Sequence, residues 1–435
     1  MVGLVDGNNF YVSCERLFNP SLNNRPVVVV SNNDGCIVAR SNEVKELGIK
    51  MGQSLHESQE LIRKHNIAVY SSNYTLYGDI SNRVMTLLSH FVEEYEIYSI
   101  DESFLSFNGF QNYDLYEYGE TIVKTVSRGT GIPVSLGIAE TKTLAKVANK
   151  FAKKYPAYRS VCIIDSDTKR EKALKLFNVS DVWGIGRRQA AKLESRGVKT
   201  AYDFTCLPIK WVRKNLPIMG ERTYRELLGE PCFDMELMPP SRKQICTSRS
   251  FGEMTSRYEV LSEAIANYAG SCARKLRQQN SVAISIMVFI HTNHFRTDQP
   301  QYSKSIIVKL PIPSFDTREN NLTKDVLGKY HCILNVFRKA RILEVEDGHK
   351  YRRFVAGEVP FADKNCIQLD LFKSNDTAKS DKLMQAIDRI NDKYKHGVRV
   401  AAQGYDKSAK WHLKQNNLSQ CYTTNINEIL SINCR

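Results

Sequence analysis

Residues 2–11 read VGLVDGNNFY, and residues 97–104 read IYSIDESF. In each stretch a short apolar run is followed by acidic residues, which places these residues at the end of a buried strand. Carboxylates brought together there lose solvation and repel one another unless cations lie between them. The two stretches therefore predict one site for two divalent cations, with Asp6, Asp101 and Glu102 as the ligands.

Each stretch also has a plain structural interpretation when it is taken alone. Asp6 could cap a helix, and Asp101 with Glu102 could form an exposed hairpin turn. Adjacent residues of a regular strand point to opposite faces of a sheet. We therefore expect Glu102 to join Asp101 only if the hairpin turns or bulges at that point.

The composition bounds the class of protein. The chain has 435 residues, 42% of them hydrophobic and 25% charged, which predicts a globular protein of roughly two to four domains. No apolar run approaches the roughly 20 residues that a membrane helix needs, and no signal sequence opens the chain, so we expect a soluble cytoplasmic protein without a membrane partner. The 11 scattered cysteines favour reduced thiols. A net charge of +14 indicates a polyanionic partner, although surplus lysine can also simply solubilise a surface.

The helix expected after a strand at residues 133–139 carries a stripe of lysines. Thr141 can cap this helix, and its apolar residues form one face. The lysines are either a solvated face or, beside the carboxylates, a contact for a triphosphate. They are Lys142, Lys146, Lys150 and Lys153.

Residues 166–235 form a second expected unit, centred on a Gly-x-Gly turn. The run VWGIGR at residues 182–187, followed by apolar residues at helical spacing, is typical of a helix-hairpin-helix. Backbone amides at such a turn can bind a DNA phosphate without reading bases, but a tight structural turn explains the glycines equally well. The residues concerned are Gly184, Gly186 and Arg187.

The third expected unit covers residues 241–361. Strand and helix periods alternate in the order βαββαβ, with helices at 261–276 and 322–339, which predicts a ferredoxin-like sandwich. The apolar run 368–372 then lies beside a polar stretch, as either a docking peptide or a short strand, and a helix resumes at 383–394.

The motifs taken together carry a resemblance. Asp6 followed by an aromatic pair, SNNDGCIVARSNE at residues 31–43 and YSIDESF at residues 98–104 closely resemble the Y-family translesion DNA polymerases, and within them the UmuC branch. The resemblance covers essentially the whole chain. It implies an α+β right-hand polymerase with a ferredoxin-like palm, small fingers, a helix-hairpin-helix thumb, a βαββαβ little finger and a C-terminal extension. The implied limits are 1–165 for palm and fingers (fingers about 17–75), 166–235 for the thumb, 241–361 for the little finger, 362–380 for a linker with a clamp-binding peptide, and 381–435 for the extension.

The same resemblance implies roles for individual residues. Asp6, Asp101 and Glu102 would be catalytic and, with the main-chain carbonyl of Gly7, would hold two Mg²⁺ ions. The other implied roles are Tyr11 as the steric gate against ribonucleotides with Phe10 beside it, Asn42, Lys45 and Lys153 near the triphosphate, Arg249 and Ser250 on DNA phosphates, and Gln368, Leu371 and Phe372 on the β sliding clamp. Many relatives outside the UmuC branch have an aromatic residue at the position of Asn42 and an arginine at that of Lys45.

The function implied is error-prone, template-directed DNA synthesis across lesions in the SOS response to DNA damage. Primer-template DNA and deoxynucleotides would be the substrates, and the UmuD′ dimer, the RecA filament and the clamp would be the partners. Two alternatives stay open: a catalytically inactive, clamp-recruited scaffold on DNA, and a two-metal nuclease or cyclase on a similar palm. A scaffold would not need Asp6, Asp101, Glu102 and Tyr11, and a nuclease or cyclase would need neither Tyr11 nor the clamp peptide.

Overall fold

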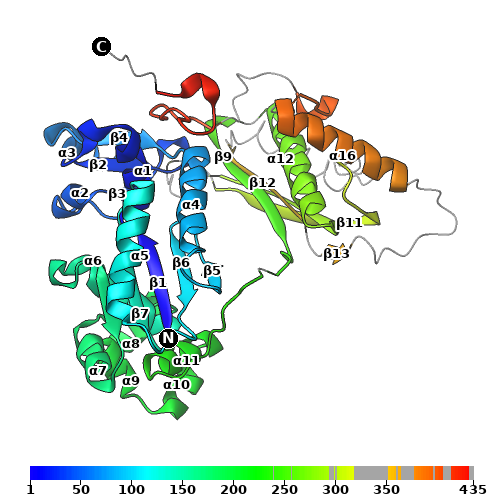
Figure 1. Ribbon diagram of the computed structural model, residues 1–435. Helices are drawn as coiled ribbons and strands as arrows, with labels where there is room; N and C mark the ends of the chain where they lie inside the picture. Colours follow the sequence, from blue (N-terminus) through cyan, green and yellow to red (C-terminus); the bar gives the residue numbers. More distant parts are fainter. Residues whose placement is uncertain are drawn as a thin grey trace. The chain divides into compact units, whose positions relative to one another are not determined.

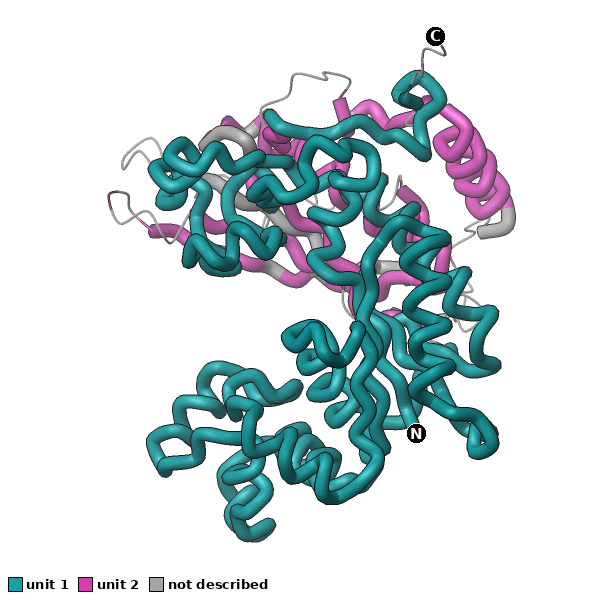
Figure 2. The backbone as a smooth tube through the Cα atoms, turned by 60° about the vertical axis from the view of Figure 1, so that its left-hand side comes forward, with its two compact units in different colours: residues 1–239, 416–435 teal, residues 240–415 magenta. Residues whose placement is uncertain are grey.

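The computed structural model describes residues 1–238, 240–255, 257–292, 298, 301–317, 351–358, 361–363, 377–394, 397–404 and 413–430. The chain packs as two compact units. Residues 1–239 with 416–435 form unit 1, and residues 240–415 form unit 2 (Figure 2). The last part of the chain is therefore divided between the two units, although the sequence suggests one continuous extension.

A five-stranded sheet forms the centre of unit 1 (Figure 1). Its order is β5-β6-β1-β7-β8, and β1 runs antiparallel to both β6 and β7. The strand expected at residues 133–139 is confirmed, as are the strand that leads to Asp6 and the hairpin around Asp101 and Glu102. The strands are β1 (Val2–Gly7), β5 (Tyr95–Ile97), β6 (Glu102–Ser106), β7 (Val134–Ala139) and β8 (Val161–Ile164).

Helices cover this sheet on both faces. Successive residues of β1 point to opposite faces, so Leu4 packs with the apolar stripe of α6, whereas Val5 packs with residues of α1, α4 and α5. The Thr141 hydroxyl caps α6 by accepting a hydrogen bond from the Leu144 amide, as predicted. The helices are α1 (Phe10–Phe18), α4 (Tyr74–Leu88), α5 (Leu115–Thr130) and α6 (Lys142–Lys154).

A smaller sheet of order β3-β2-β4 is formed by residues that lie between β1 and β5 in the sequence. The four valines of β2 are all buried because alternate side chains enter two different cores, Val27 and Val29 one core and Val28 and Val30 the other. Its elements are β2 (Val27–Val30), β3 (Ile37–Arg40), α2 (Asn42–Glu46), α3 (Gln59–Lys64) and β4 (Ala68–Ser71).

Residues 166–235 are helical, as predicted. Their apolar side chains join the same core as α6 and Leu4. The helices are α7 (Asp167–Leu176), α8 (Arg187–Glu194), α9 (Ala201–Thr205), α10 (Ile209–Asn215) and α11 (Ile218–Leu227). Short 3₁₀ helices of unit 1 are Pro20–Leu22, Asn32–Asp34, Pro156–Tyr158, Val179–Asp181 and Ile426–Glu428.

Unit 2 contains an antiparallel sheet of order β11-β10-β12-β9, with β13 paired to β10. Helix α12 packs on one face, where it buries Ile286, Val288 and Ile290 of β10. The first strand of this unit lies at an edge of the sheet, whereas a ferredoxin-like sheet has its first strand in the centre, so that detail of the prediction is wrong. The elements are β9 (Ile245–Thr255), α12 (Tyr258–Gln278), β10 (Ser281–His291), β11 (Ser303–Ser314), β12 (Tyr351–Glu358) and β13 (Phe361–Asp363).

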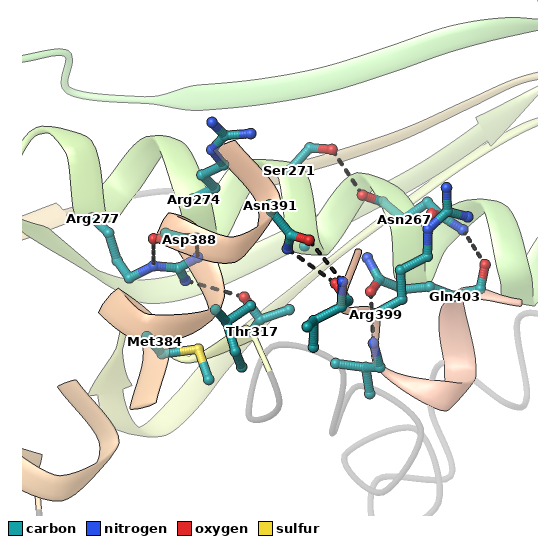
Figure 3. A pocket seen from close by; sticks show the side chains of 14 residues that line it. Asn267, Ser271, Arg274, Arg277, Thr317, Met384, Asp388, Asn391, Arg399 and Gln403 are labelled. Carbon is teal, nitrogen blue, oxygen red and sulfur yellow. Dashed lines mark hydrogen bonds and ion pairs between the residues drawn. The ribbon is translucent and has the colours of Figure 1, made fainter. Parts of the chain in front are cut away.

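Helix α16 (Thr377–Tyr394) packs beside α12 through ion pairs. Arg277 donates two hydrogen bonds of 2.7 Å to the Asp388 carboxylate, at one side of a cavity of about 320 Å³ (Figure 3). The helix begins six residues before the predicted start at Leu383, so the end of the predicted linker is helical. The 3₁₀ helix Ala401–Gln403 also contacts α12, since Asn267 donates to the Gln403 carbonyl.

Two predictions lie outside the described residues: the helix at 322–339 and the peptide with Gln368, Leu371 and Phe372. Across the described ranges, no helix is long and apolar enough to cross a membrane. The eight cysteines in those ranges are free thiols.

Candidate active site

The two acidic stretches meet where β1 and β6 pair. Asp6 lies opposite Glu102 in the antiparallel register, and the Gly7 amide donates to the Asp101 carbonyl at 2.8 Å. Asp101 ends a bend that immediately precedes β6, and the amides of Tyr98 and Ser99 both donate to the Glu102 carbonyl. The irregular turn that Glu102 requires is therefore present.

Helix α6 supplies counter-charges to two of the three carboxylates. Lys153 forms an ion pair with Asp6, and Lys146 contacts both Glu102 oxygens at 2.9 Å. The Asp101 carboxylate accepts a hydrogen bond of 2.6 Å from the Ser99 hydroxyl. Two of the three carboxylates are thus paired with lysines, and the third accepts a hydrogen bond from a neutral hydroxyl.

The protonation of Asp6 reflects its environment. Burial raises the pKa of Asp6 to about 6, Lys153 opposes this rise, and the negative charges of Glu102 and Asp101 add to it. Among the residues that the structure describes, no three acidic, histidine or cysteine side chains are already arranged around a metal position. The donors are nevertheless all hard oxygens, which suit Mg²⁺, and a divalent cation would relieve the repulsion around Asp6. The residues fit the metal once the lysines release their carboxylates.

The lysine stripe of α6 is solvated only in part, since Lys142 is buried whereas Lys150 and Lys153 are exposed. Lys142 is 4% exposed, and its ammonium contacts Glu96 at 2.5 Å and the Asp234 carbonyl at 2.7 Å. Lys150 forms an ion pair with Asp181 at 2.6 Å. A buried ammonium requires a partner, so the solvated interpretation is wrong for Lys142, and each of the four lysines pairs with a carboxylate.

Lys45 adds positive charge near Asp6. The Lys45 ammonium donates to Asn9 at 2.6 Å and to Asn42 at 3.2 Å. Burial lowers the pKa of Lys45, the positive charges of Arg40 and Lys153 lower it further, and Asp6 opposes them. Asn42 therefore holds Lys45 in place. Sequence reasoning missed Arg40 and Asn9, although both stand beside motif residues that it quoted.

The Tyr11 ring is fixed by other aromatic rings. It stacks on Tyr77 with centroids 4.6 Å apart and planes 16° apart, and Tyr74 meets its edge at 6.0 Å. Burial raises the pKa of Tyr11 to about 12, so the phenol is neutral near pH 7. Phe10 is 4% exposed and packs under Gly7 rather than beside an open pocket. Tyr74 and Tyr77 were not predicted; their helical spacing was the available signal.

The predicted Gly-x-Gly turn opens helix α8. Gly184 has a φ of +89°, which an L-residue rarely adopts, and Gly186 is the N-cap residue that precedes Arg187. The indole of Trp183 donates to the Tyr98 hydroxyl at 3.1 Å, so this turn contacts the loop that leads to Asp101.

Arg249 and Ser250 lie on opposite faces of the sheet in unit 2. Arg249 shares its side of β9 with the buried residues Ile245 and Thr247, next to α12, although its own side chain is exposed. Ser250 pairs with the position opposite His291 in β10, on the face away from α12. The two side chains therefore leave β9 on opposite faces.

Comparison with solved structures defines the class. A Y-family DNA polymerase chimera of Dbh and Dpo4 superposes with a TM-score of 0.60, covering 82% of this chain and 98% of that chain at 20% identity. The likeness shows that the fold is that of a Y-family DNA polymerase, the α+β class that the motifs predict.

Sequence comparison then gives the family. Residues 5–150 match the impB/mucB/samB family, 242–328 its C-terminal domain, and 381–432 a domain of unknown function. Protein UmuC of Salmonella typhimurium is 40% identical over 435 residues, covering 99% of this chain and 100% of the relative, and protein ImpB of the same species is 37% identical over 99% of each chain. The chain belongs to the UmuC branch of the Y-family DNA polymerases.

The expected activity is confirmed at this level. The chain is a DNA-directed DNA polymerase of the translesion class that acts in the SOS response, with DNA and nucleotides as substrates. These relatives give no support to the inactive-scaffold alternative or to the nuclease or cyclase alternative.

Proposed function

We propose that nucleotidyl transfer takes place at Asp6, Asp101 and Glu102, with the Gly7 carbonyl as a further ligand of two Mg²⁺ ions. One observation carries this proposal: the carboxylates at the end of β1 and β6 lie beside a group of cations, Arg40, Lys45 and Lys153. Carboxylates beside cationic side chains suit a metal-bound triphosphate, because the carboxylates can bind the metal ions and the cationic side chains can bind the phosphates.

When bound, the two Mg²⁺ ions would lower the pKa of the primer 3′-hydroxyl and stabilise the leaving pyrophosphate. The protein's own contribution is to hold three carboxylates at the end of a rigid sheet. Lys146 would release Glu102 as the site is loaded, and three aromatic rings near its ammonium, those of Tyr98, Phe104 and Trp183, would keep it close by.

The triphosphate would be bound by Lys45 and Lys153. Lys153 can exchange its contact with Asp6 for a phosphate oxygen, since its side chain is 31% exposed. Asn42 and Asn9 orient Lys45, and Arg40 adds charge behind it. We assign Phe10 a supporting role under Gly7, because its buried ring leaves little surface for a nucleotide.

Tyr11 is proposed as the steric gate. Its ring is neutral and held between Tyr77 and Tyr74, so it would exclude a 2′-hydroxyl by occupying space rather than by charge. A ring fixed on two sides cannot move aside cheaply, and this stiffness is what a gate needs.

DNA contacts are proposed on both units. In unit 1 the amides beside Gly184 and Gly186, at the start of α8, and the Arg187 side chain would bind backbone phosphates. In unit 2 we assign the face away from α12 to DNA, with Ser250 as a contact. Arg249, on the other face, would contribute only a charge at a distance.

The partners are proposals that rest on the UmuC relationship. Gln368, Leu371 and Phe372 would dock on the β sliding clamp, and the UmuD′ dimer and the RecA filament would bind the polymerase. We expect the protein to act in the bacterial cytoplasm, at the nucleoid when recruited.

Primer extension with Mg²⁺ and deoxynucleotides tests the proposed centre. Asp101→Ala removes a ligand from an interaction worth several kcal/mol, so extension should fall about a thousandfold. The matched control is Asp165→Ala, which removes an exposed carboxylate that pairs with Lys169 and should leave the rate unchanged. Undiminished extension by Asp101→Ala would show that the chemistry lies elsewhere.

A further inference from the structure

The end of the chain is fastened to the small sheet of unit 1. The Ser71 amide donates to the Asn417 carbonyl at 2.9 Å, the Asn417 amide donates to the Ser71 hydroxyl at 3.0 Å, and Leu418 bridges to Ser71 in parallel. The Asn416 amide donates to Asp34 at 2.9 Å. Residues 416–422, which we call the tail segment, thus extend the free edge of β4.

The tail segment also contacts the start of helix α4. Asn73 is the N-cap of this helix and is 3% exposed; its side chain accepts a hydrogen bond from the Leu76 amide. Its amide nitrogen donates to the carbonyls of Ser419 and Gln420 at 3.0 and 3.2 Å. One buried side chain therefore joins the tail segment to the helix that carries Tyr74 and Tyr77.

A buried carboxylate makes the next connection. Glu15, on helix α1, is 2% exposed and accepts hydrogen bonds from the Tyr77 hydroxyl at 2.6 Å and the Ser419 hydroxyl at 3.0 Å, both on the same oxygen. Burial raises the pKa of Glu15, and these two hydrogen bonds oppose the rise. The orientation of Tyr77 thus depends on a carboxylate that the tail segment helps to satisfy.

Tyr77 in turn supports Tyr11. The two rings stack at 4.6 Å, and Tyr77 is fully buried, so a change in its orientation reaches Tyr11 directly. The tail segment holds α1 at a second point, where Tyr422 stacks on Phe18 with centroids 4.7 Å apart. Helices α1 and α4, which carry both rings, are therefore each held by the tail segment.

We propose that the tail segment sets the position of the Tyr11 ring, and that Ser419 is a positioning residue for discrimination against ribonucleotides. The connection runs from Ser419 through Glu15 and Tyr77 to Tyr11. This inference rests on the proposed role of Tyr11 as the gate. It gives a function to the last part of a region that matches a domain of unknown function.

Single-nucleotide insertion by the full-length chain tests the proposal. For each variant, kcat/KM is measured with a deoxynucleotide and with the matching ribonucleotide. Ser419→Ala should raise the ribo-to-deoxy ratio about threefold to tenfold, the range that one lost hydrogen bond allows, while deoxynucleotide insertion stays within about twofold of wild type. Ser419→Thr keeps the hydroxyl and should restore the wild-type ratio.

Two further variants separate the possible failures. Thr424→Ala removes an exposed hydroxyl close to the tail segment and should leave the ratio unchanged. Tyr11→Ala should raise the ratio more than Ser419→Ala does. If Tyr11→Ala raises the ratio but Ser419→Ala leaves it unchanged, or lowers both insertions equally, the gate stands and the positioning role of Ser419 is overturned. An unchanged ratio in Tyr11→Ala overturns the gate itself, and the positioning role with it.

Discussion

The two large sheets of this polymerase are covered differently. The central sheet of unit 1 has helices on both faces, so Leu4 and Val5, adjacent in β1, enter two separate cores. The sheet of unit 2 has α12 on one face, where Ile286, Val288 and Ile290 are buried, while Met287, Phe289 and His291 on the other face are partly exposed.

This difference determines where each sheet can bind a ligand. A sheet covered on both faces is accessible only at the ends of its strands, and there Asp6 and Glu102 lie. A sheet with a free face offers a broad surface, which suits a long polymer better than a small reactive group. We therefore expect catalysis at the ends of the strands in unit 1, and binding of the DNA backbone on a face of the sheet in unit 2.

The largest test of this comparison concerns stability. Leu4→Ala truncates a side chain that is 1% exposed and should cost about 3 kcal/mol of the free energy of unfolding. Met287→Ala, on the free face of β10, should cost less than about 1 kcal/mol. Urea denaturation of both variants measures the two values. Equal losses would mean that the free face is as well packed as the core of unit 1.

A smaller effect is expected from pH, and it should be confined to unit 1. The pKa of Asp6 rises from 3.8 to about 6 in the folded protein, so folding stabilises the protonated form of Asp6 relative to the ionised form. The contribution of Asp6 to the metal-free free energy of unfolding should therefore be greatest at low pH and decline as pH rises through this interval. A cation must displace the proton, so apparent Mg²⁺ affinity should fall about tenfold between pH 7 and pH 5.

Mg²⁺ titrations of primer extension at several pH values, with DNA affinity as the control, would check this expectation. Because the groups proposed to bind DNA in unit 2 are not carboxylates, DNA affinity should change little over the same interval. An Mg²⁺ requirement independent of pH from 5 to 7 would contradict the buried, protonatable Asp6.

The smallest effect sharpens the distinction between the two faces of the unit 2 sheet. Ser250→Ala removes one hydroxyl from the free face and should weaken primer-template binding about threefold. Arg249→Ala, on the face next to α12, should leave the slope of affinity against salt changed by less than about one unit, since no phosphate contact is lost. Fluorescence anisotropy at several salt concentrations measures both. The reverse result would exchange the roles of the two faces.

Local patterns were sufficient to predict part of the site. An apolar run that ends in Asp6, a hairpin around Asp101 and a helix capped by Thr141 all depend on residues close together in the sequence. The sequence showed that Glu102 needs a bend before β6. It could not show that the bend is present, because the bend depends on the pairing of β6 with β1.

The remaining features depend on distant contacts. Lys142 was expected either in solvent or near a triphosphate, because its actual partner, Glu96, is 46 residues away in the sequence; Ser419 likewise lies 404 residues from Glu15. The strand order in unit 2 likewise follows from long-range pairing that the sequence of elements does not fix. Such contacts leave no periodic signal along one chain, so spacing alone could not reveal them.

The pairing of Lys153 with Asp6 and of Lys146 with Glu102 has a consequence for cation binding. The two ammonium groups contact the carboxylates that incoming cations would bind, so the cations would have to compete with them. Metal binding would then exchange a lysine ammonium for a metal ion at each of the two carboxylates. Cation affinity at this cluster should therefore be lower than three unpaired carboxylates would give, because two ammonium groups must first be displaced.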